Sequence, residues 1–220
     1  MIWFFNWFVK ITGYIVQKIV FRTKVYYENK SIQSKRIKGS AIIISNHTSV
    51  WDYAVFLFVF FFRTLRYQMA EVLFKKKFLG LFLRCMGGIY VNRDTHNFSF
   101  MSKSEKLLKK GKVVGVFPES RLPKPDEEKP LKFTPSVACL ALSSGAKIVP
   151  VYTSGNMFSK KRVRVIIGEP ITVADYYDES LSEKENIEKI TEMLREKIIG
   201  LEKLLDEKSK KSKKGKTVLN

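Results

Sequence analysis

The sequence predicts an α/β fold: a mostly parallel central sheet flanked by helices, with an N-terminal helical segment suited to a membrane interface. Short apolar runs rich in β-branched residues alternate with longer helical patterns, as in strands joined by crossover helices. The 220 residues, 45% of them hydrophobic and 28% charged, fit one globular domain with its own core. Residues 1–22 are mostly aromatic or branched aliphatic.

Residues 1–22 predict one helix with an unusually wide apolar face. At about 100° per residue, its few polar or small residues share a narrow stripe: Asn6, Lys10, Gly13 and Gln17. So wide an apolar face must be buried in lipid or against protein. Trp3, Trp7 and Tyr14 suit a lipid interface, and the nearby charges are all basic. We therefore expect residues 1–30 to form an amphipathic membrane-associating segment; the alternative is a helix packed into the core.

Five buried strands are predicted from runs of Ile, Val and aromatic residues: residues 40–45, 88–92, 112–117, 147–152 and 162–168. Pro150 has no backbone N–H, so its strand should contain an unpaired or bulged position there.

The helices between the strands are predicted from apolar periodicity and end signals: residues 52–62, 99–110 and 134–144, with a basic stretch at 71–85 that is helical or loop-like. Thr134 is the expected N-cap of the third helix, with Pro135 in its first turn and Gly145 just past its end. A last helix is expected from Ser182, where Glu185 completes a capping box.

These elements place the main domain at residues 31–206, with a loop rich in proline and charge at 121–132. Residues 207–220 are dominated by lysine with serine and glycine, a composition typical of a disordered tail. Such a tail is either simply solvated or attached electrostatically to anionic lipid.

The chain is strongly basic, with 40 Lys and Arg against 21 Asp and Glu and a net charge of +19. Such an excess calls for a polyanionic partner: nucleic acid, an anionic membrane face or phosphorylated small molecules. The lysines gather in the tail and on helices and do not interleave with aromatic residues on strands. A nucleic-acid partner is therefore not expected.

Several classes of site and segment are not expected. Cys85 and Cys139 stand alone in apolar segments, which predicts buried thiols in a reducing compartment and no disulfide framework or Cys-based zinc site. The carboxylates are not clustered at metal-ligand spacing, so no metal is expected. No uncharged run reaches the roughly 20 residues of a membrane span, and residues 1–22 lack the features of a signal peptide.

Chemically capable side chains follow three of the predicted strands. His47 follows the first, Arg93 the second, and Glu119 and Arg121 the third. Ligands of parallel sheets bind outside the carboxyl ends of the strands. If these strands are parallel neighbours, the imidazole, the carboxylate and the two guanidiniums should converge on one edge of the sheet.

His47 and Asp52 are the candidate catalytic pair. A continuous helix would separate them by about 140°, so they can meet only if His47 lies on a turn and Asp52 in the first turn of the next helix. Ser49 as N-cap, three residues before Asp52, supports that geometry and also a purely capping role for Asp52. As a dyad, Asp52 would orient His47, the general base. No G-x-S-x-G elbow or catalytic-looking cysteine offers a nucleophile. The proton would then come from a substrate alcohol that attacks an activated acyl group directly.

The stretch NHTSVWD at residues 46–52 resembles the first motif of the 1-acylglycerol-3-phosphate acyltransferase (lysophosphatidate acyltransferase) family of glycerolipid acyltransferases. Further stretches resemble that family's later motifs in the same order: EVLFK at 71–75 with Gly80, GIYVNR at 88–93, FPESR at 117–121 and IVPV at 148–151. The resemblance covers roughly residues 40–170 and is specific because the motifs are ordered.

The resemblance implies a reaction and roles for residues. The reaction is acyl transfer from acyl-CoA or acyl-carrier protein to the free hydroxyl of 1-acylglycerol-3-phosphate, giving phosphatidic acid, with no cofactor besides the acyl donor. His47 would be the base and Asp52 its orienting partner. Arg93 and Arg121 would hold the acceptor phosphate, and Glu119 would meet an acceptor hydroxyl or orient an arginine.

Ser120 departs from the resemblance at the substrate-binding segment. It stands where the family has Gly, and Arg121 follows it without an intervening Thr. Gly is used where the backbone needs a positive φ or a close approach to a ligand. The departure therefore bears on the geometry of the phosphate site and leaves the His47–Asp52 dyad untouched.

The same resemblance suggests a peripheral or monotopic protein on the cytoplasmic face of the cytoplasmic membrane, with an anionic membrane surface as partner. Residues 53–62 would line an acyl groove, dip into lipid or form a buried core helix. One alternative is a sister acyltransferase acting on another lysolipid or on glycerol-3-phosphate. Another, of a different class, is a non-catalytic basic protein that binds lipid or nucleic acid.

Overall fold

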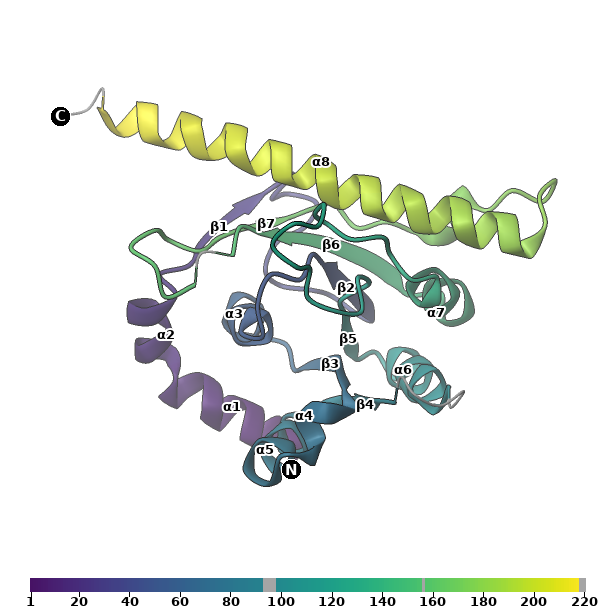
Figure 1. Cartoon of the computed structure of the whole chain (residues 1–220), viewed down its shortest axis with the longest axis horizontal. Coiled ribbons are helices and arrows are strands. Elements are labelled where there is room, and N and C mark those ends of the chain that lie inside the picture. Colours follow the sequence, from purple (N-terminus) through teal and green to yellow (C-terminus); the bar gives the residue numbers. More distant parts are fainter. Residues whose placement is uncertain (93–97, 156, 218–220) are drawn as a thin grey trace.

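A seven-stranded sheet forms the centre of the molecule (Figure 1). The computed structural model describes residues 1–92, 98–155 and 157–217, and the elements named here lie in that part of the chain. The strand order is β1-β7-β6-β2-β5-β3-β4. The strands are β1 (Lys24–Tyr27), β2 (Ala41–Ser45), β3 (Leu65–Ala70), β4 (Ile89–Val91), β5 (Val113–Val116), β6 (Lys147–Thr153) and β7 (Arg164–Ile167). Neighbours pair in parallel except β6 and β7, so the predicted mostly parallel sheet is confirmed.

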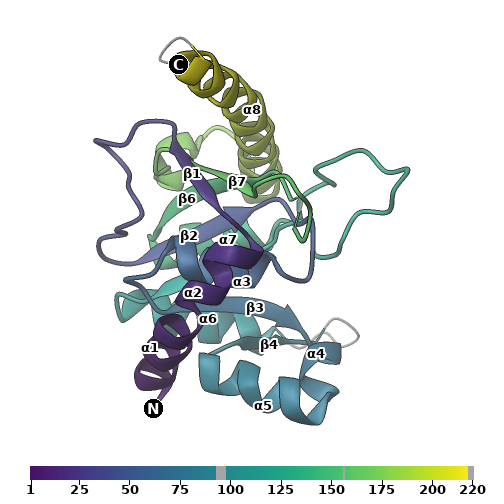
Figure 2. The same ribbon diagram turned by 90° about the vertical axis from the view of Figure 1, so that its left-hand side faces the viewer.

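Helices cover both faces of the sheet, as Figures 1 and 2 show. The helices are α1 (Ile2–Thr12), α2 (Tyr14–Val20), α3 (Asp52–Val59), α4 (Glu71–Lys75), α5 (Lys77–Met86), α6 (Ser99–Lys109), α7 (Ser136–Ser144) and α8 (Glu183–Thr217), with a short 3-10 turn at Val173–Tyr176. Helices α6, α7 and α8 lie on one face, and α2 and α3 on the other.

The core divides into two layers because side chains alternate along each strand. In β2, Ile42 and Ile44 pack in the layer under α6, α7 and α8, whereas Ile43 packs in the layer under α3. All five residues of β2 are buried. The loop after β2 therefore leaves from the middle of the sheet, between β5 and β6, where two parallel neighbours present their carboxyl ends beside it.

The predicted N-terminal helix is broken in two and lies with its polar stripe toward the protein. It divides at Gly13, where a Cβ would lie 2.9 Å from the ring of Phe58, so only glycine permits this close approach to α3. Asn6, Lys10 and Gln17 are buried. Most apolar side chains of α1 and α2 face away from the domain, and Trp3 is 67% exposed, whereas Phe5 and Trp7 are half-buried against Phe82 and Phe61. The helices are therefore packed on the domain as the alternative expected, but mainly through their polar stripe and not through the wide apolar face.

Lys10 fastens α1 to the end of α3. Its ammonium donates to the carbonyl oxygens of Phe60 (3.4 Å), Phe61 (2.8 Å) and Arg63 (2.6 Å). All three carbonyls lie just past the C-terminus of α3, where backbone acceptors need donors, and the Phe60 carbonyl also accepts from the Arg63 N–H at 3.0 Å. Burial lowers the pKa of Lys10 to about 8. These hydrogen bonds explain why the polar stripe faces inward: its side chains donate to backbone carbonyls of the domain.

Several predicted elements need correction. Strands β1 and β3 were not predicted from the sequence. Their segments, KVYY and LRYQMA, are short and half-buried, and each follows a long apolar helical run from which its pattern is hard to separate. The helix predicted at 52–62 ends at Val59, and the stretch 71–85 forms two helices that meet at Lys76. Cys85 and Cys139 are free thiols, half-buried where burial was expected.

The bulge predicted at Pro150 is present on the β7 side of β6. Ile148 pairs with Ile171 while Val151 pairs with Ile167, so three steps along β6 oppose four along its partner. The N-cap prediction for Thr134 is wrong, since α7 begins at Ser136. The Thr134 hydroxyl instead donates to the carbonyl of Pro118.

The last helix begins as predicted and ends later than predicted. Ser182 and Glu185 form the expected capping box, with the Ser182 N–H donating to the Glu185 carboxylate at 2.9 Å. Helix α8 then continues to Thr217 through most of the predicted disordered tail. Contacts with the sheet edge support this extension: Arg164 donates to Ser209 (2.7 Å) and Lys24 to Ser212 (2.6 Å).

Within the described residues, no helix combines the length and the apolar character that crossing a bilayer requires.

Candidate active site

His47 lies on the loop that leaves the carboxyl end of the central strand β2. Asn46, just before it, is buried and bridges to β6: its side-chain N–H donates to the Thr153 carbonyl, and its side-chain oxygen accepts from the Thr153 N–H, both at 2.9 Å. Through these two hydrogen bonds, the Asn46 side chain continues the pairing of β2 with β6 beyond the end of β2. The start of the loop is therefore rigid before the imidazole is reached.

Glu119, at the end of the neighbouring strand β5, holds the backbone of the same loop. One carboxylate oxygen accepts from the His47 N–H at 2.7 Å and the other from the Leu131 N–H at 2.8 Å. The side chain is almost fully buried, and burial raises its pKa above the ordinary value while the two backbone donors lower it. In the described part of the chain, the Glu119 carboxylate contacts no arginine side chain and instead joins two loops through their amides; its expected contact with an acceptor hydroxyl stays a prediction.

The His47–Asp52 pair has the predicted geometry. His47 Nδ1 lies 2.8 Å from Asp52 Oδ2, and the Asp52 carboxylate is fully buried. Three further donors reach that carboxylate: the Thr48 N–H at 2.7 Å, the Thr48 hydroxyl at 2.8 Å and the Ser49 N–H at 2.9 Å. An Nδ1–H that donates to Asp52 leaves Nε2 as the ring nitrogen with a free lone pair.

Asp52 performs the capping and the orienting role together. The bond from the Ser49 N–H is the reciprocal half of the predicted capping box. The other half is absent, because the Ser49 hydroxyl accepts from the Trp51 N–H at 3.2 Å and α3 has Trp51 as its N-cap. The loop is thus folded around the carboxylate that also orients the histidine.

Phe117 fixes the plane of the imidazole. Its ring is stacked on that of His47, with 4.2 Å between centroids and 14° between planes. Phe117 in turn packs against Tyr67 at 5.0 Å. The Tyr67 ring lies directly over Gly115, where a Cβ would come within 2.3 Å of it, so glycine at this point of β5 makes room for the aromatic stack. No role for Phe117 was predicted from the sequence.

Two cavities of different character meet at His47. The larger, of about 630 Å³, is here called the polar cavity; its lining includes Glu119, Lys129, Tyr152 and Glu202. The smaller, of about 290 Å³, is the apolar cavity, with Met69, Leu73, Leu79, Leu83 and Phe117 among its lining residues. His47, Val50 and Trp51 line both.

Tyr53, at the start of the predicted 53–62 segment, lines the apolar cavity. Its hydroxyl is buried and has no hydrogen-bond partner among the described residues, and burial raises its pKa. Farther along α3, the side chains of Val55, Phe56 and Val59 belong to the core. The segment is therefore core helix for most of its length and cavity wall at its start.

Ser120 keeps the backbone conformation for which glycine is best suited. Its φ is 61°, in the left-handed region that costs an ordinary residue energy. Its hydroxyl lies 3.4 Å from that of Thr134, and the residue lines the apolar cavity. Ser120 therefore adopts the left-handed backbone conformation that glycine would adopt at this turn, at the cost of backbone strain.

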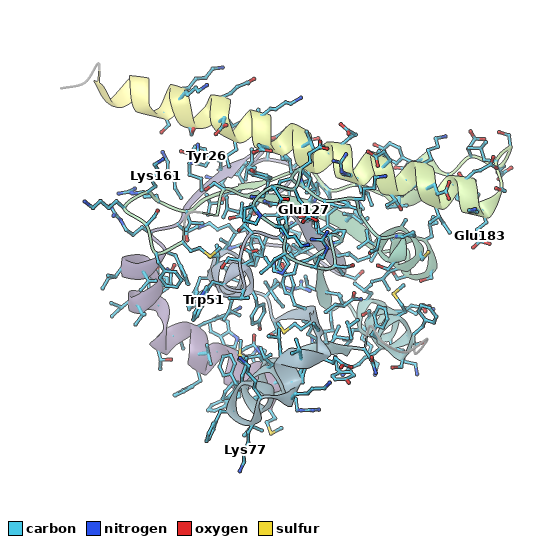
Figure 3. The ribbon with its side chains drawn as sticks, viewed as in Figure 1. Tyr26, Trp51, Lys77, Glu127, Lys161 and Glu183 are labelled. Atoms are coloured by element: carbon cyan, nitrogen blue, oxygen red, sulfur yellow. The ribbon has the colours of Figure 1, made fainter. Side chains whose placement is uncertain are left out.

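Arg121 is paired within its own loop. Its two terminal nitrogens contact the two oxygens of Glu127 at 2.6 and 2.7 Å, and this guanidinium lowers the pKa of Glu127 to about 2. In Figure 3, Glu127 lies above Trp51, on the loop 121–132. Neither Arg121 nor Glu127 is among the residues that line the two cavities. The predicted convergence is thus found for His47 and Glu119 and not for Arg121, while Arg93 lies outside the described residues.

Asn46, Thr48 and Phe117 are the residues whose roles sequence analysis missed. A signal for Phe117 existed in the strand order: β2 and β5 are parallel neighbours with Ile44 opposite Val116, so the residues just beyond them must be close. Thr48 and Asn46 gave no such signal, because their contacts depend on the path of the loop. Among the described residues, no cluster of three or more His, Cys, Asp and Glu side chains could hold a metal ion.

Comparisons with known proteins identify the family of the chain. A family model described as Acyltransferase matches residues 22–154. A 1-acyl-sn-glycerol-3-phosphate acyltransferase from Bacillus subtilis (strain 168) is 32% identical over 148 residues, covering 65% of this chain and 71% of that protein. One from Borreliella burgdorferi is 26% identical over 176 residues, covering 74% and 66%.

Among solved structures, the fold resembles the crystal structure of the 1-acyl-sn-glycerophosphate acyltransferase PlsC from Thermotoga maritima. The TM-score is 0.60 at 21% sequence identity, over 83% of this chain and 73% of that one. The structural likeness supports the fold, and the family model and the Bacillus relative carry the assignment. The chain therefore belongs to the 1-acylglycerol-3-phosphate acyltransferase family of glycerolipid acyltransferases and is an O-acyltransferase.

Proposed function

We propose that this protein transfers a fatty acyl group from acyl-CoA or acyl-carrier protein to the free hydroxyl of 1-acylglycerol-3-phosphate, giving phosphatidic acid at a membrane surface. The observation that carries the proposal is the 2.8 Å His47–Asp52 pair at the point where a polar and an apolar cavity meet. Both relatives are named 1-acyl-sn-glycerol-3-phosphate acyltransferases, which supports this acceptor.

The proton moves through His47. Nε2 removes the proton of the acceptor hydroxyl as its oxygen bonds to the thioester carbonyl carbon, and Asp52 stabilises the resulting imidazolium. The tetrahedral intermediate collapses as the carbon–sulfur bond breaks. The departing thiolate then accepts from Nε2 the proton that came from the acceptor hydroxyl. The products are the new ester and a free thiol, and His47 returns to its starting state.

The backbone N–H of Val50 is the proposed donor to the oxyanion. The neighbouring Ser49 N–H already donates to Asp52 and is therefore not available for this role. Among the described residues, the Val50 N–H has no hydrogen-bond partner, and Val50 lines both cavities beside His47. A preorganised donor of this kind stabilises a tetrahedral oxyanion by a few kcal/mol.

The two cavities supply different binding environments. The apolar cavity, walled by Leu73, Leu79 and Leu83, suits the acyl chain of the donor. The polar cavity suits the glycerol phosphate of the acceptor, with Lys129 on its wall. Arg93 and Arg121 remain the proposed phosphate ligands. The terminal nitrogens of Arg121 now contact the Glu127 carboxylate. To bind phosphate, they must either release this carboxylate or hold the phosphate beside it.

The proposed membrane surface is formed by α1, α2 and α5. The outward side chains of α1 and α2 are apolar, with Ile19 71% exposed, and α5 adds Phe78 at 86%. Large exposed apolar patches on a monomer mark interaction sites. Lysines border this surface, among them Lys77, which Figure 3 shows extending outward from α5, and such residues favour anionic lipid. We propose peripheral attachment to the cytoplasmic face of the membrane.

The test is a product assay with purified protein. Wild type is incubated with acyl-CoA or acyl-carrier protein thioester and a panel of acceptors in vesicles, and labelled lipid products are separated. We expect phosphatidic acid from 1-acylglycerol-3-phosphate. The His47→Ala variant should lose about 10² to 10⁴ in kcat with an unchanged thermal midpoint.

The outcomes separate the alternatives. Product only from glycerol-3-phosphate or from another lysolipid would replace the proposed acceptor and keep the dyad. Full turnover by folded His47→Ala protein would overturn the dyad itself. No transfer with any acceptor, together with salt-dependent binding of nucleic acid, would identify a non-catalytic basic protein.

A further inference from the structure

A second site lies between α2 and α3, away from His47. Its cavity, here the α2–α3 cavity, has a volume of about 380 Å³. Its walls come from α2, α3, the start of β1, the β1–β2 connection and the residues just before β7. It shares no lining residue with the polar or the apolar cavity at His47.

The α2–α3 cavity is strongly cationic. Four basic side chains line it and no carboxylate does: Lys18, Arg22, Lys35 and Arg162. Among the described residues, none of the four forms an ion pair. Four unpaired cations around one cavity repel one another unless an anion joins them. The arrangement therefore fits a phosphate group.

Two further observations point to a ligand. The hydroxyl of Thr23, which lines the same cavity, is buried and has no hydrogen-bond partner in the described part of the chain. A buried hydroxyl without a partner is costly, and a rotation of the Thr23 side chain toward the cavity would let it donate to a phosphate oxygen. Arg22 has a φ of 49°, at a helix end where glycine is the usual residue. The chain thus accepts backbone strain at the position that brings a guanidinium to this cavity.

The cationic site opens into an apolar one. An adjoining cavity of about 370 Å³ shares Tyr14, Lys35, Phe58 and Val59 with it and adds Ile11, Phe61 and Phe62. The pair therefore runs from a basic end to an aromatic end. This polarity matches an amphiphile with an anionic head and does not match free inorganic phosphate.

The apolar end is continuous with the exposed face of α1 and α2. Ile11, on the wall of the adjoining cavity, is 64% exposed, and Ile15 belongs to the same outward surface. Figure 3 shows Lys161, next to Arg162, on the α2 side of the molecule. A lipid could therefore reach the basic end from the proposed membrane surface while its chains stay in apolar surroundings.

We propose that the α2–α3 cavity binds one anionic glycerophospholipid of the bilayer, with its phosphate among Lys18, Arg22, Lys35 and Arg162 and the start of its chains along Phe61 and Phe62. This is a binding site separate from the acyl-transfer site. The proposal does not depend on which acceptor the enzyme uses.

The test measures binding of a soluble lipid probe, dihexanoyl phosphatidylglycerol, to the full chain by titration calorimetry at constant salt. We expect wild type and His47→Ala to bind alike. The Lys35→Glu/Arg162→Glu variant should bind about tenfold or more weakly, since each basic residue near an anionic lipid strengthens its binding and each glutamate opposes it. Dihexanoyl phosphatidylcholine should bind wild type at least tenfold more weakly than the anionic probe.

A matched control carries the same change in net charge elsewhere. Lys110→Glu/Lys112→Glu alters two exposed lysines that line none of these cavities and should keep wild-type affinity within about twofold. The milder Lys35→Gln/Arg162→Gln pair serves if the glutamate variant has a lowered thermal midpoint. Phe62→Ser tests the apolar end and should weaken lipid binding at intact fold.

Four results would overturn the proposal. Equal loss in the Lys110/Lys112 control would mean a non-specific charge effect. Loss of binding in His47→Ala would place the probe in the acyl-transfer site. Displacement of the lipid by inorganic phosphate at equal concentration would make the cavity a free-anion site. Equal affinity for the phosphatidylcholine probe would remove the role of the four cations.

Discussion

The rings of His47 and Phe117 lie in near-parallel contact, 4.2 Å apart and inclined by 14°. Asp52 holds one edge of the imidazole through Nδ1, and Phe117 holds its face. In the proposed mechanism, a base kept in one plane and one tautomer needs no reorganisation when the acceptor hydroxyl arrives. The contact joins residues that follow two neighbouring strands, β2 and β5.

Replacing Phe117 tests this positioning role. We expect Phe117→Leu to lower kcat about tenfold, with little change in KM, because the imidazole becomes free to tilt while the apolar cavity keeps an apolar side chain at this position and the polar cavity, which Phe117 does not line, is unchanged. Steady-state kinetics with both substrates would measure it. Phe98→Leu, an exposed phenylalanine away from the site, is the control. A Phe117→Leu effect confined to KM would contradict the role.

The strain at Ser120 predicts a gain in stability. At a φ of 61°, replacement by glycine should raise the free energy of unfolding by about 1 kcal/mol, because glycine adopts this conformation without steric cost. Ser120→Ala keeps the strain and should give no gain. Urea unfolding of the three proteins would show it, and an equal gain in both variants would contradict the argument.

The Arg121–Glu127 pair predicts opposite effects on acceptor binding. Arg121→Ala should raise the KM for the phosphorylated acceptor about tenfold if the guanidinium holds its phosphate. Glu127→Gln should lower that KM, because it frees the same guanidinium from its carboxylate partner. Kinetics with varied acceptor at fixed donor would measure both. Unchanged KM in both variants would leave Arg121 a structural residue of the loop.

Lys10 predicts a specific dependence of stability on pH. Its pKa is about 8 in the folded protein and near 10.5 in the unfolded chain. Between these values the unfolded chain binds the proton that the folded protein has released, so this group makes stability rise with pH. The difference in unfolding free energy between wild type and Lys10→Met should therefore grow from pH 8 to pH 10.5.

The same pH series with Lys103→Met, an exposed lysine on α6, should give a flat difference. At pH 7 we expect Lys10→Met to be less stable than wild type by about 2 kcal/mol, since it leaves the carbonyls of Phe61 and Arg63 without their lysine donor. A difference that falls with rising pH would contradict the assignment.

The outward apolar face of α1 and α2 predicts membrane attachment that can be removed without unfolding. Phe4→Ser/Ile15→Ser/Ile19→Ser changes three side chains that are exposed in the folded protein. Co-sedimentation with anionic vesicles should fall about tenfold or more, since each replacement removes roughly 1.5 to 3 kcal/mol of apolar burial in lipid. Tyr176→Ser/Tyr177→Ser, also exposed, should bind like wild type.

The sequence allowed the dyad to be predicted because His47 and Asp52 are joined by a short loop with its own capping signal. Glu119 was placed near His47 by the rule that parallel strands end at one edge. The Arg121–Glu127 pair was missed because the path of the loop 121–132 follows from no periodicity. β3 was missed because its pattern, half polar and half buried, follows the long apolar run of α3.

The direction of the N-terminal helices shows a further limit. The separation of Asn6, Lys10 and Gln17 from the apolar residues is visible in the sequence. Which side turns inward depends on backbone carbonyls after α3 that need a donor, and these become apparent only in the folded chain. The polar stripe was therefore identified correctly, while its orientation required tertiary structure.

The four hydrogen bonds received by Asp52 affect the choice of an inactive reference protein. Any replacement of this carboxylate would release the turn around it and disturb shape and turnover together. Loss of activity in such a mutant would say little about proton transfer. The imidazole of His47 makes one of those bonds and can be removed while the turn stays closed. An inactive but correctly folded enzyme, suitable for binding intact substrates, is therefore best obtained by replacing His47.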